Sequence, residues 1–296
     1  MSPEVWIPIT LAAAFFQNIR SYLQKRLVDV STVHGGAYVR FLYALPFAWL
    51  YVFAIADDPF VMSPNATFWM YCAVGAISQI VGTAFLLASF AGGQFAVGTV
   101  LSKTEAAQAL LFGMLLLGDA VSSAAIAGIA ISFLGVLLIS GRMSLEQLNG
   151  RTLGLGLGAG SAFGVAAVGF RGAALSLPVD SALQAAAITL AVAVSIQTLL
   201  YGAYLGIREP SSLRVAVEQW RIGLRVGMSG MAASACWFTA MALVSAALVR
   251  ALGQVELLFT LATSAWLLGE RIGRREVLGV ALVVGGLVLI TITPTG

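Results

Sequence analysis

Among the ionisable residues inside long apolar stretches of this 296-residue chain, five ask for explanation and are the first candidates for chemistry: Arg20, Lys103, Glu105, Arg171 and Glu256. A charge at the centre of a membrane helix costs at least about 2.5–3.5 kcal/mol on insertion scales. Each of these residues must therefore face the protein interior or water and have a partner. Charges held at that cost indicate a site for a polar ligand or a coupling ion.

The positions of four of these residues predict two ion pairs. Arg20 lies nine residues before the expected end of its helix, and Glu105 lies eleven after the expected start of its own, on the same side. At 1.5 Å per residue these depths are roughly 13 and 17 Å, within about one turn of each other. We expect Arg20 to meet Glu105, and Arg171 to meet Glu256 in the same way from the opposite side. Such pairs serve either as structural braces or as part of the site.

Lys103 has no charged counterpart in the second half of the chain, where Gln254 stands 151 residues later. It is two residues from Glu105, or roughly 200° around a helix, so the two side chains do not face each other. A feature that breaks the symmetry of a repeat is a better candidate for substrate contact than one that the symmetry preserves. We therefore expect Lys103 to meet an anionic group of a substrate.

Further polar and aromatic side chains at a similar depth are expected to help form a cavity. Each also has an ordinary interpretation, as a hydrogen-bonding partner of a neighbouring helix or as core filling. Trp237 lies in the middle of an apolar segment, whereas tryptophan in membrane proteins is commonest at the interfaces. The candidates are Gln17, Gln79, Gln108, Trp237, Tyr43 and Phe16.

Chemistry that the sequence lacks narrows the function. It has no nucleotide-binding loop and no cluster of His, Cys and carboxylate residues at metal spacing. Its one histidine, His34, stands at an expected loop end, and Cys72 and Cys236 lie in apolar segments as free thiols. We therefore expect no enzyme, no metal and no cofactor. The basic residues stand in short connections, so the pI of about 9.1 does not imply nucleic acid.

The elements that position these residues are apolar helices. The chain is 59% hydrophobic and 10% charged, with a mean hydropathy of +0.95, whereas about 25% charged residues are usual in soluble domains. A membrane-spanning helix needs roughly 20 mostly apolar residues. Ten such stretches are expected, near residues 5–27, 35–56, 66–90, 94–117, 122–140, 152–174, 181–206, 220–243, 246–268 and 275–293.

The chain also repeats itself weakly at a spacing of 151 residues. Arg20 falls on Arg171, Glu105 on Glu256, and several glycines fall on glycines. Each copy holds five apolar segments, an odd number, so the second copy enters the membrane from the opposite side. We predict an all-α integral membrane protein with ten transmembrane helices as two inverted five-helix repeats, residues 1–145 and 146–296, in a single transmembrane domain. This arrangement is typical of transporters that alternate access around a central site.

Glycines are dense in the segment near residues 152–174, at Gly154, Gly156, Gly158, Gly160 and Gly164. Small residues four apart let helix backbones approach closely. The run predicts either plain tight packing or a helix that slides during a conformational change.

Several motifs resemble those of the EamA-type transporters of the drug/metabolite transporter superfamily. Leu267-Leu268-Gly269-Glu270-Arg271 with the later Val284-Gly285-Gly286-Leu287 is similar to the family's closing signature, and Leu116-Leu117-Gly118-Asp119 repeats it in the first half. Tyr38-Val39-Arg40-Phe41 resembles the arginine-containing start of the family's second helix. The resemblance covers essentially the whole chain, and it implies ten helices and secondary transport of small metabolites through a central cavity.

The chain departs from the family pattern in two places. Phe15-Phe16-Gln17-Asn18-Ile19-Arg20 replaces the family's usual Trp-Gly-Ser/Thr-like stretch, and the proline often found in helices four and nine is absent. The resemblance therefore leaves the substrate open.

The distribution of charge and the habit of the family predict opposite orientations in the membrane. The positive-inside rule places both termini away from the cytoplasm, whereas both termini are usually cytoplasmic in the family. The charge argument rests on basic residues in the connections of one side: Lys25, Arg26, Arg142, Arg151, Arg208, Arg214, Arg271, Arg274 and Arg275.

We expect a secondary active or facilitative transporter of a small polar metabolite that is amino-acid-like, zwitterionic or anionic. Burial of Glu105 and Glu256 would favour their protonated forms and couple transport to protons, whereas pairing with Arg20 and Arg171 would keep them ionised. A multidrug or organic-cation exporter is the second possibility, and a structural or regulatory protein or a lipid scramblase is the third. The expected setting is a monomer in the cell (inner) membrane that crosses the bilayer several times.

Overall fold

The computed structural model describes residues 4–28, 32–55, 64–89, 95–139, 150–259, 261–262 and 273–292. This part of the chain is helical and contains no strand, which confirms the all-α prediction. The helices are α1 (Trp6–Val28), α2 (Val33–Ile55), α3 (Ala66–Ser89), α4 (Phe95–Ser102), α5 (Glu105–Leu117), α6 (Ser123–Ile139), α7 (Gly150–Leu175), α8 (Ala182–Arg208), α9 (Pro210–Glu218), α10 (Trp220–Leu243), α11 (Ala246–Leu252), the 3₁₀ turn η2 (Gly253–Val255) and α13 (Arg274–Ile292).

Seven described helical stretches are long and apolar enough to cross a membrane. They are His34–Ile55, Ala66–Ser89, Gly98–Leu117, Gly150–Leu175, Ala182–Arg208, Trp220–Leu243 and Arg274–Ile292. The apolar helix α6 is shorter, and α1 carries a polar stretch around Gln17 and Arg20. The full count of ten spans and their inverted order stay predictions.

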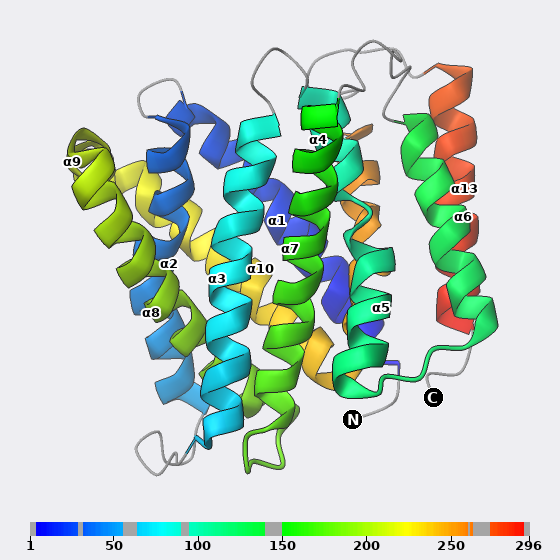
Figure 1. Ribbon diagram of the computed structural model, residues 1–296, viewed down its shortest axis with the longest axis horizontal. Helices are drawn as coiled ribbons and strands as arrows, with labels where there is room; N and C mark the ends of the chain where they lie inside the picture. The colour runs from blue at the N-terminus through cyan, green and yellow to red at the C-terminus, as the bar shows by residue number, and fades with distance from the viewer. Residues whose placement is uncertain are drawn as a thin grey trace.

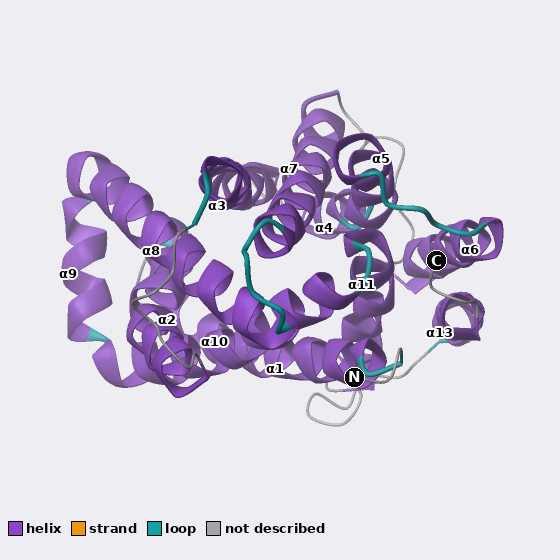
Figure 2. Cartoon of the chain, turned by 90° about the horizontal axis from the view of Figure 1, so that it is seen from below, coloured by secondary structure: helices purple, strands orange, loops and turns teal. Residues whose placement is uncertain are grey.

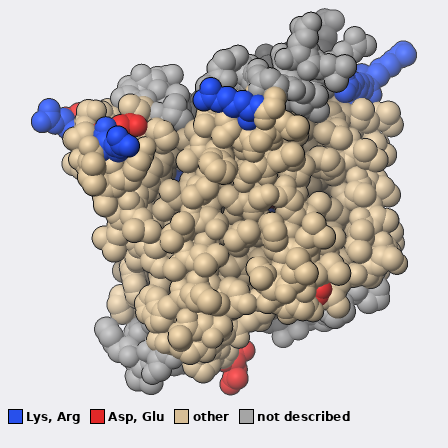
Figure 3. Space-filling view, viewed as in Figure 1, with Lys and Arg blue, Asp and Glu red and all other residues tan. Residues whose placement is uncertain are grey.

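The helices run side by side, with α6 and α13 paired at one edge of the bundle and α8 and α9 at the other (Figure 1). The start of α1 and the end of α13 lie at the same end of the bundle (Figure 1). On the face drawn in Figure 3, basic side chains gather at the opposite end, and the broad middle is uncharged. The positive-inside argument for orientation rests on this gathering of basic residues at the end opposite the termini.

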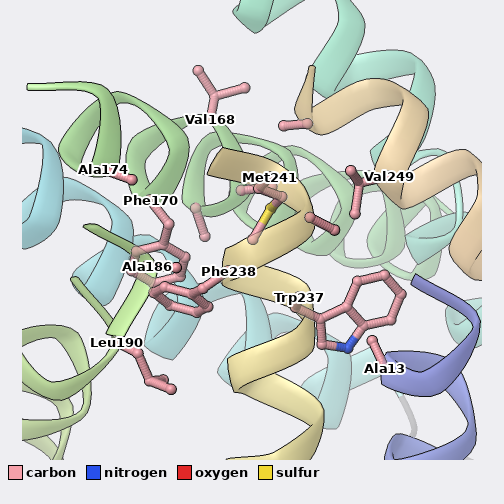
Figure 4. Packing of buried hydrophobic residues seen from close by; sticks show 14 of the residues in the cluster. Ala13, Val168, Phe170, Ala174, Ala186, Leu190, Trp237, Phe238, Met241 and Val249 are labelled. Atoms are coloured by element: carbon pink, nitrogen blue, oxygen red, sulfur yellow. The ribbon is translucent and has the colours of Figure 1, made fainter. Parts of the chain in front are cut away.

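The core is built largely from small side chains, so the helices approach one another closely. Alanines such as Ala13, Ala109 and Ala191 are fully buried. Among the larger residues, the rings of Phe170 and Phe238 stack with centroids 4.5 Å apart (Figure 4). Between apolar helices in lipid, dispersion contacts of this kind replace the hydrophobic driving force.

Four glycines bring the backbones of α6 and α13 into contact. A Cβ on Gly286 would lie 2.6 Å from the Gly128 carbonyl oxygen, and one on Gly135 would lie 2.6 Å from the Gly279 carbonyl oxygen. Since Gly128 and Gly135 stand 151 residues before Gly279 and Gly286, the repeated glycines form one shared helix–helix contact. Close backbone approach explains why these positions hold no side chain.

A matched pair of substitutions tests this contact. Gly286→Ala is expected to lower the free energy of unfolding by about 1–3 kcal/mol because the new methyl group overpacks the α6 backbone. Gly285→Ala is the control, since nothing lies within 4 Å of its Cβ position, and it should leave stability unchanged or slightly raised. Thermal unfolding in detergent compares the two. Equal melting temperatures would contradict the contact.

Candidate functional site

Two helices are interrupted at positions that the repeat relates. Between α4 and α5, Lys103 and Thr104 form a turn whose amides donate to the carbonyls of Val100 and Leu101, at 3.0 and 3.2 Å. Between α11 and the helical residues 256–259, η2 forms a 3₁₀ turn. Residues 102–104 stand 151 before residues 253–255. Figure 2 shows α4, α5 and α11 close together beside α7.

The glycines of α7 explain how the first break is packed. Cβ atoms on Gly156 and Gly160 would lie 2.6 Å from the Leu101 Cβ and the Thr104 Oγ1 respectively, and one on Gly164 would lie 3.1 Å from the backbone of Ala109. These glycines are four apart and form one stripe along α7. The contact supports the tight-packing interpretation of the glycine run, and nothing tests helix sliding.

Glu256 stands directly after the second break and joins it to α1 and to the first break. Its Oε2 accepts a hydrogen bond from Gln17 Nε2 at 2.7 Å and lies 3.4 Å from Lys103 Nζ. Trp237 Nε1 in turn donates to Gln17 Oε1 at 3.0 Å. The predicted candidates Gln17, Lys103, Trp237 and Glu256 therefore form one connected network.

Glu105 begins α5 directly after the first break and is bound by Arg250 of α11. Arg250 Nε donates to Glu105 Oε1 at 2.6 Å, and the guanidinium carbon lies 4.8 Å from the ring centroid of Trp237. A Cβ on Gly253 would overlap Trp237 Cη2, so glycine makes room for the ring. Trp237 therefore contacts Arg250 directly and is linked to Glu256 through Gln17. In Figure 4 its ring points from α10 toward α1.

A small cavity lies between the two ion pairs, Lys103–Glu256 and Arg250–Glu105. Its volume of about 10 Å³ admits about one water molecule, so it must widen to hold a metabolite. Gln254 is 3% exposed, and its Oε1 accepts from Ser132 at 2.5 Å while its Nε2 has no hydrogen-bond partner. The lining residues are Lys103, Glu105, Trp237, Arg250, Gly253, Gln254 and Glu256.

Arg20 does not form the pair that its depth predicts. Glu105 is taken by Arg250, and the charge of Arg20 acts instead on Glu256 and Arg250. Its Nε is buried without a hydrogen-bond partner. The expected Arg20–Glu105 pair is wrong because depth along a helix fixes height but not the direction in which a side chain points.

Arg171 also has a different partner from the predicted Glu256. Its Nε lies 3.2 Å from both carboxylate oxygens of Asp119, and its Nη1 donates to the Met241 and Val244 carbonyls at 2.7 Å. Gly118, with φ of 68°, ends α5 in the left-handed conformation and sets the turn to Asp119. Arg171 is thus a brace between α7, the end of α5 and the end of α10, outside the cavity lining.

Besides Gln17, Arg20 and Arg171, four more predicted site residues lie outside the cavity lining. Gln108 donates to Thr104 Oγ1 at 2.7 Å and faces α7. Gln79 Oε1 accepts from Gln197 at 2.6 Å, between α3 and α8. Tyr43 donates to the Ala216 carbonyl at 2.9 Å, and Phe16 packs against the core beside Phe15. Each makes the contact of its ordinary interpretation, a hydrogen bond between segments for Gln108, Gln79 and Tyr43 and core packing for Phe16.

Arg250 is the main site residue that sequence reasoning missed. It stands four residues after the expected start of an apolar stretch, where a charge is usual at a helix end. The signal that identifies it is the one used for Lys103, because Thr99 stands 151 residues earlier and the charge belongs to one half only. Lys103 and Arg250, which have no charged counterpart in the other half of the chain, both line the cavity.

A model of the EamA-like transporter family matches residues 152–292. The matched segment is just under half of the chain, and it is similar to that family. The family is part of the drug/metabolite transporter superfamily, so the resemblance read from the motifs is confirmed in this segment, and the match indicates a membrane transporter of that type.

A solved structure described only as "Crystal structure of protein" superposes on the EamA-like chain with a TM-score of 0.76. The match covers 100% of both chains at 14% sequence identity, so it shows a shared fold alone. No curated protein matches the sequence.

Proposed function

We propose that this EamA-like protein is a secondary carrier that moves a small metabolite bearing an acidic group, either an anion or an amino-acid-like zwitterion, by alternating access. The observation that carries the proposal is the pair of helix breaks at repeat-related positions, each followed directly by a glutamate. Breaks at corresponding positions of two halves are the best pointer to a transporter's binding site. We infer that Lys103–Thr104 and Gly253–Val255 form the two sides of that site.

The balance of charge in the site favours an acidic solute. Within the part of the chain that the structure describes, Lys103, Arg250 and Arg20 face two carboxylates, Glu105 and Glu256, which leaves one positive charge in excess there. The Nε2 of Gln254 and the Nε of Arg20 are also hydrogen-bond donors without partners. An acceptor group with negative charge is the ligand that satisfies both features.

The two glutamates are held differently, and this supports different roles. Arg250 Nε approaches Glu105 to 2.6 Å, whereas Lys103 Nζ stands 3.4 Å from Glu256. A solute carboxylate that takes Lys103 would leave Glu256 with less positive charge and favour its protonation. We propose Glu256 as the residue that couples transport to protons, if coupling occurs, and Glu105 as part of a brace.

An exporter of organic cations is the weaker alternative. Such a protein needs an accessible carboxylate without a fixed cation, and both site glutamates are paired. A scramblase or a structural protein would not need the interior charges.

We propose the inner cell membrane as the location and a monomer as the working unit, since a repeat pair can close its own interface.

Uptake into proteoliposomes tests the proposal. The panel contains radiolabelled amino acids, organic acids, nucleobases and organic cations, and it compares the native protein with Lys103→Gln. Arg274→Gln is the matched control because Arg274 is exposed at the start of α13. Saturable uptake of an acidic solute, lost only in Lys103→Gln, is the expected result. Uptake of cations alone would favour the exporter, and no saturable flux of any solute would favour the non-transport alternatives.

A further inference from the structure

The hydroxyl of Ser132 makes an unusual contact for a serine inside a helix. Serine and threonine there commonly donate to the carbonyl three or four residues earlier, as Thr189 does to the Ala185 carbonyl at 2.7 Å. Ser132 of α6 is fully buried, and its hydroxyl donates instead to Gln254 Oε1 in η2, at 2.5 Å. A residue of α6 therefore holds the side chain of a residue in the second break.

This hydrogen bond decides which end of the Gln254 amide is left over. The oxygen of a carboxamide accepts and its nitrogen donates, so the bond from Ser132 occupies Oε1 and leaves the N–H groups of Nε2. Gln254 is 3% exposed, lines the cavity, and its Nε2 has no hydrogen-bond partner among the described residues. Buried amide donors are normally bonded, so an unpaired one in a cavity lining indicates a position for an acceptor.

Gln108 shows a similar contact without a donor left over. Its Oε1 accepts from Ser161 of α7, and its Nε2 donates to Thr104 Oγ1 at 2.7 Å and to the Leu157 carbonyl at 3.4 Å. Both ends of this amide are used, and Gln108 lies outside the cavity lining. Holding a glutamine with a serine does not by itself leave a donor unpaired, so the unpaired Nε2 of Gln254 is a feature of the cavity.

The repeat brings a second donor to the same cavity. Gln254 stands 151 residues after Lys103, and both residues line the cavity, whose volume is about 10 Å³. A space that admits about one water molecule brings its lining groups within reach of one small ligand group. Lys103 Nζ lies 3.4 Å from Glu256 Oε2, longer than the roughly 2.7–2.9 Å of a strong charged hydrogen bond. Equivalent positions of the two breaks therefore supply an ammonium and an amide donor.

Two donors at one cavity fit a carboxylate better than its amide. Both oxygens of a carboxylate accept hydrogen bonds, whereas a carboxamide accepts at its oxygen and donates at its nitrogen. One donor of such a pair would face an N–H group if an amide were bound. A buried site that leaves polar groups unpaired in this way rejects the wrong ligand.

We propose that Lys103 and Gln254 form a carboxylate clamp, in which each residue donates to one oxygen of the solute's carboxylate group. Ser132 is its positioning residue, because it holds the Gln254 amide with the nitrogen left for the solute. The inference rests on the proposed carrier function. It adds the chemical class of the acidic group, a carboxylate, and the means by which the site distinguishes an acid from its amide.

Ligand binding to the purified full chain in detergent tests the clamp without any transport assay. Thermal unfolding is followed at constant ionic strength with L-alanine and succinate, with their amides alaninamide and succinamide, and with inorganic phosphate. The variants are Gln254→Met, which removes the donor at similar length, and Ser132→Ala. Ser229→Ala is the matched control, because the buried Ser229 hydroxyl donates to the Arg225 carbonyl of its own helix.

We expect alanine or succinate to stabilise the native protein and to bind at least roughly tenfold more tightly than its amide. Gln254→Met should raise the dissociation constant of the acid by roughly tenfold or more, because a hydrogen bond to a charged group is lost. It should also reduce the preference for acid over amide. Ser229→Ala should change neither quantity.

Ser132→Ala should weaken binding of the acid by roughly two- to tenfold, the range for one neutral hydrogen bond. It should have no further effect on binding when added to Gln254→Met, because Ser132 acts through the amide. A purely structural serine would instead lower stability and leave the preference for acid over amide as it is. Gln254→Glu covers the case in which Gln254→Met fails to fold, since it keeps the acceptor for Ser132 and replaces the donor.

Three outcomes would overturn the clamp: no stabilisation by either carboxylate, stabilisation by phosphate alone, or an unchanged acid preference in the Gln254 variants. Failure of the carrier proposal looks different. In that case the acid preference would still depend on Gln254, while proteoliposomes would take up no solute from the transport panel.

Discussion

Replacing Arg250 with glutamine is expected to lower the free energy of unfolding by about 3–5 kcal/mol and to abolish transport. The reason is that Glu105, whose side chain is 8% exposed, would lose the cation that forms its ion pair within the described residues. Trp237 would lose the guanidinium that lies over its ring. Thermal unfolding in detergent and proteoliposome uptake measure the two effects separately.

The double variant Arg250→Gln with Glu105→Gln is the control for this prediction. It removes both charges, so most of the lost stability should return, because an uncharged pair leaves no buried ion without a partner. Transport should stay low, since the site loses one of its cations. A single variant as stable as the native protein would show that the ion pair contributes little.

Replacing Arg171 with glutamine is expected to cost a similar 3–5 kcal/mol of stability, but to leave solute affinity unchanged in the protein that still folds. Arg171 binds Asp119 and the carbonyls of Met241 and Val244. Its loss leaves a carboxylate and two carbonyl oxygens with fewer donors. The measurement pairs the melting temperature with the dissociation constant for the best solute.

Arg171→Gln combined with Asp119→Asn is the matched control, and it should recover part of the stability. A variant that keeps its melting temperature but binds solute more weakly would place Arg171 in the site and not in a brace. The contrast with Arg250 distinguishes these two arginines by function.

The sequence was most informative about which residues meet at the centre. Lys103, Glu105 and Glu256 were found because a charge in an apolar stretch is costly and needs a polar surrounding. Gln17 was found because it stands at a similar depth, and Trp237 because it lies mid-segment, away from the interfaces where tryptophan is commonest. Hydropathy also placed the long apolar helices, since a run of about 20 apolar residues in lipid has no alternative to a helix. It predicted neither α9 nor the two helix breaks.

The partners of those charges could not be read from the sequence. The repeat argument paired each arginine with a glutamate of its own half, whereas Arg250 binds Glu105 across the halves and Asp119 binds Arg171. Pairing depends on the direction in which each side chain leaves its helix. A helix break changes that direction for the residues in it and directly after it. The break at Lys103–Thr104 contains no proline, so the sequence gives no local signal for it. It is packed against Gly160 of α7, a contact between segments far apart in the chain.

Access to position 254 from each side of the membrane tests the central claim, that the paired breaks form a site that opens alternately. Gln254→Cys is made in a Cys72→Ala, Cys236→Ala background, and a membrane-impermeant thiol reagent is added to one side at a time. Ala193→Cys is the control, because Ala193 is fully buried in α8 and the thiol placed there should not react. The account predicts that the cysteine introduced by Gln254→Cys reacts from both sides, and that solute slows both reactions. Labelling from one side only, or from neither, would contradict it.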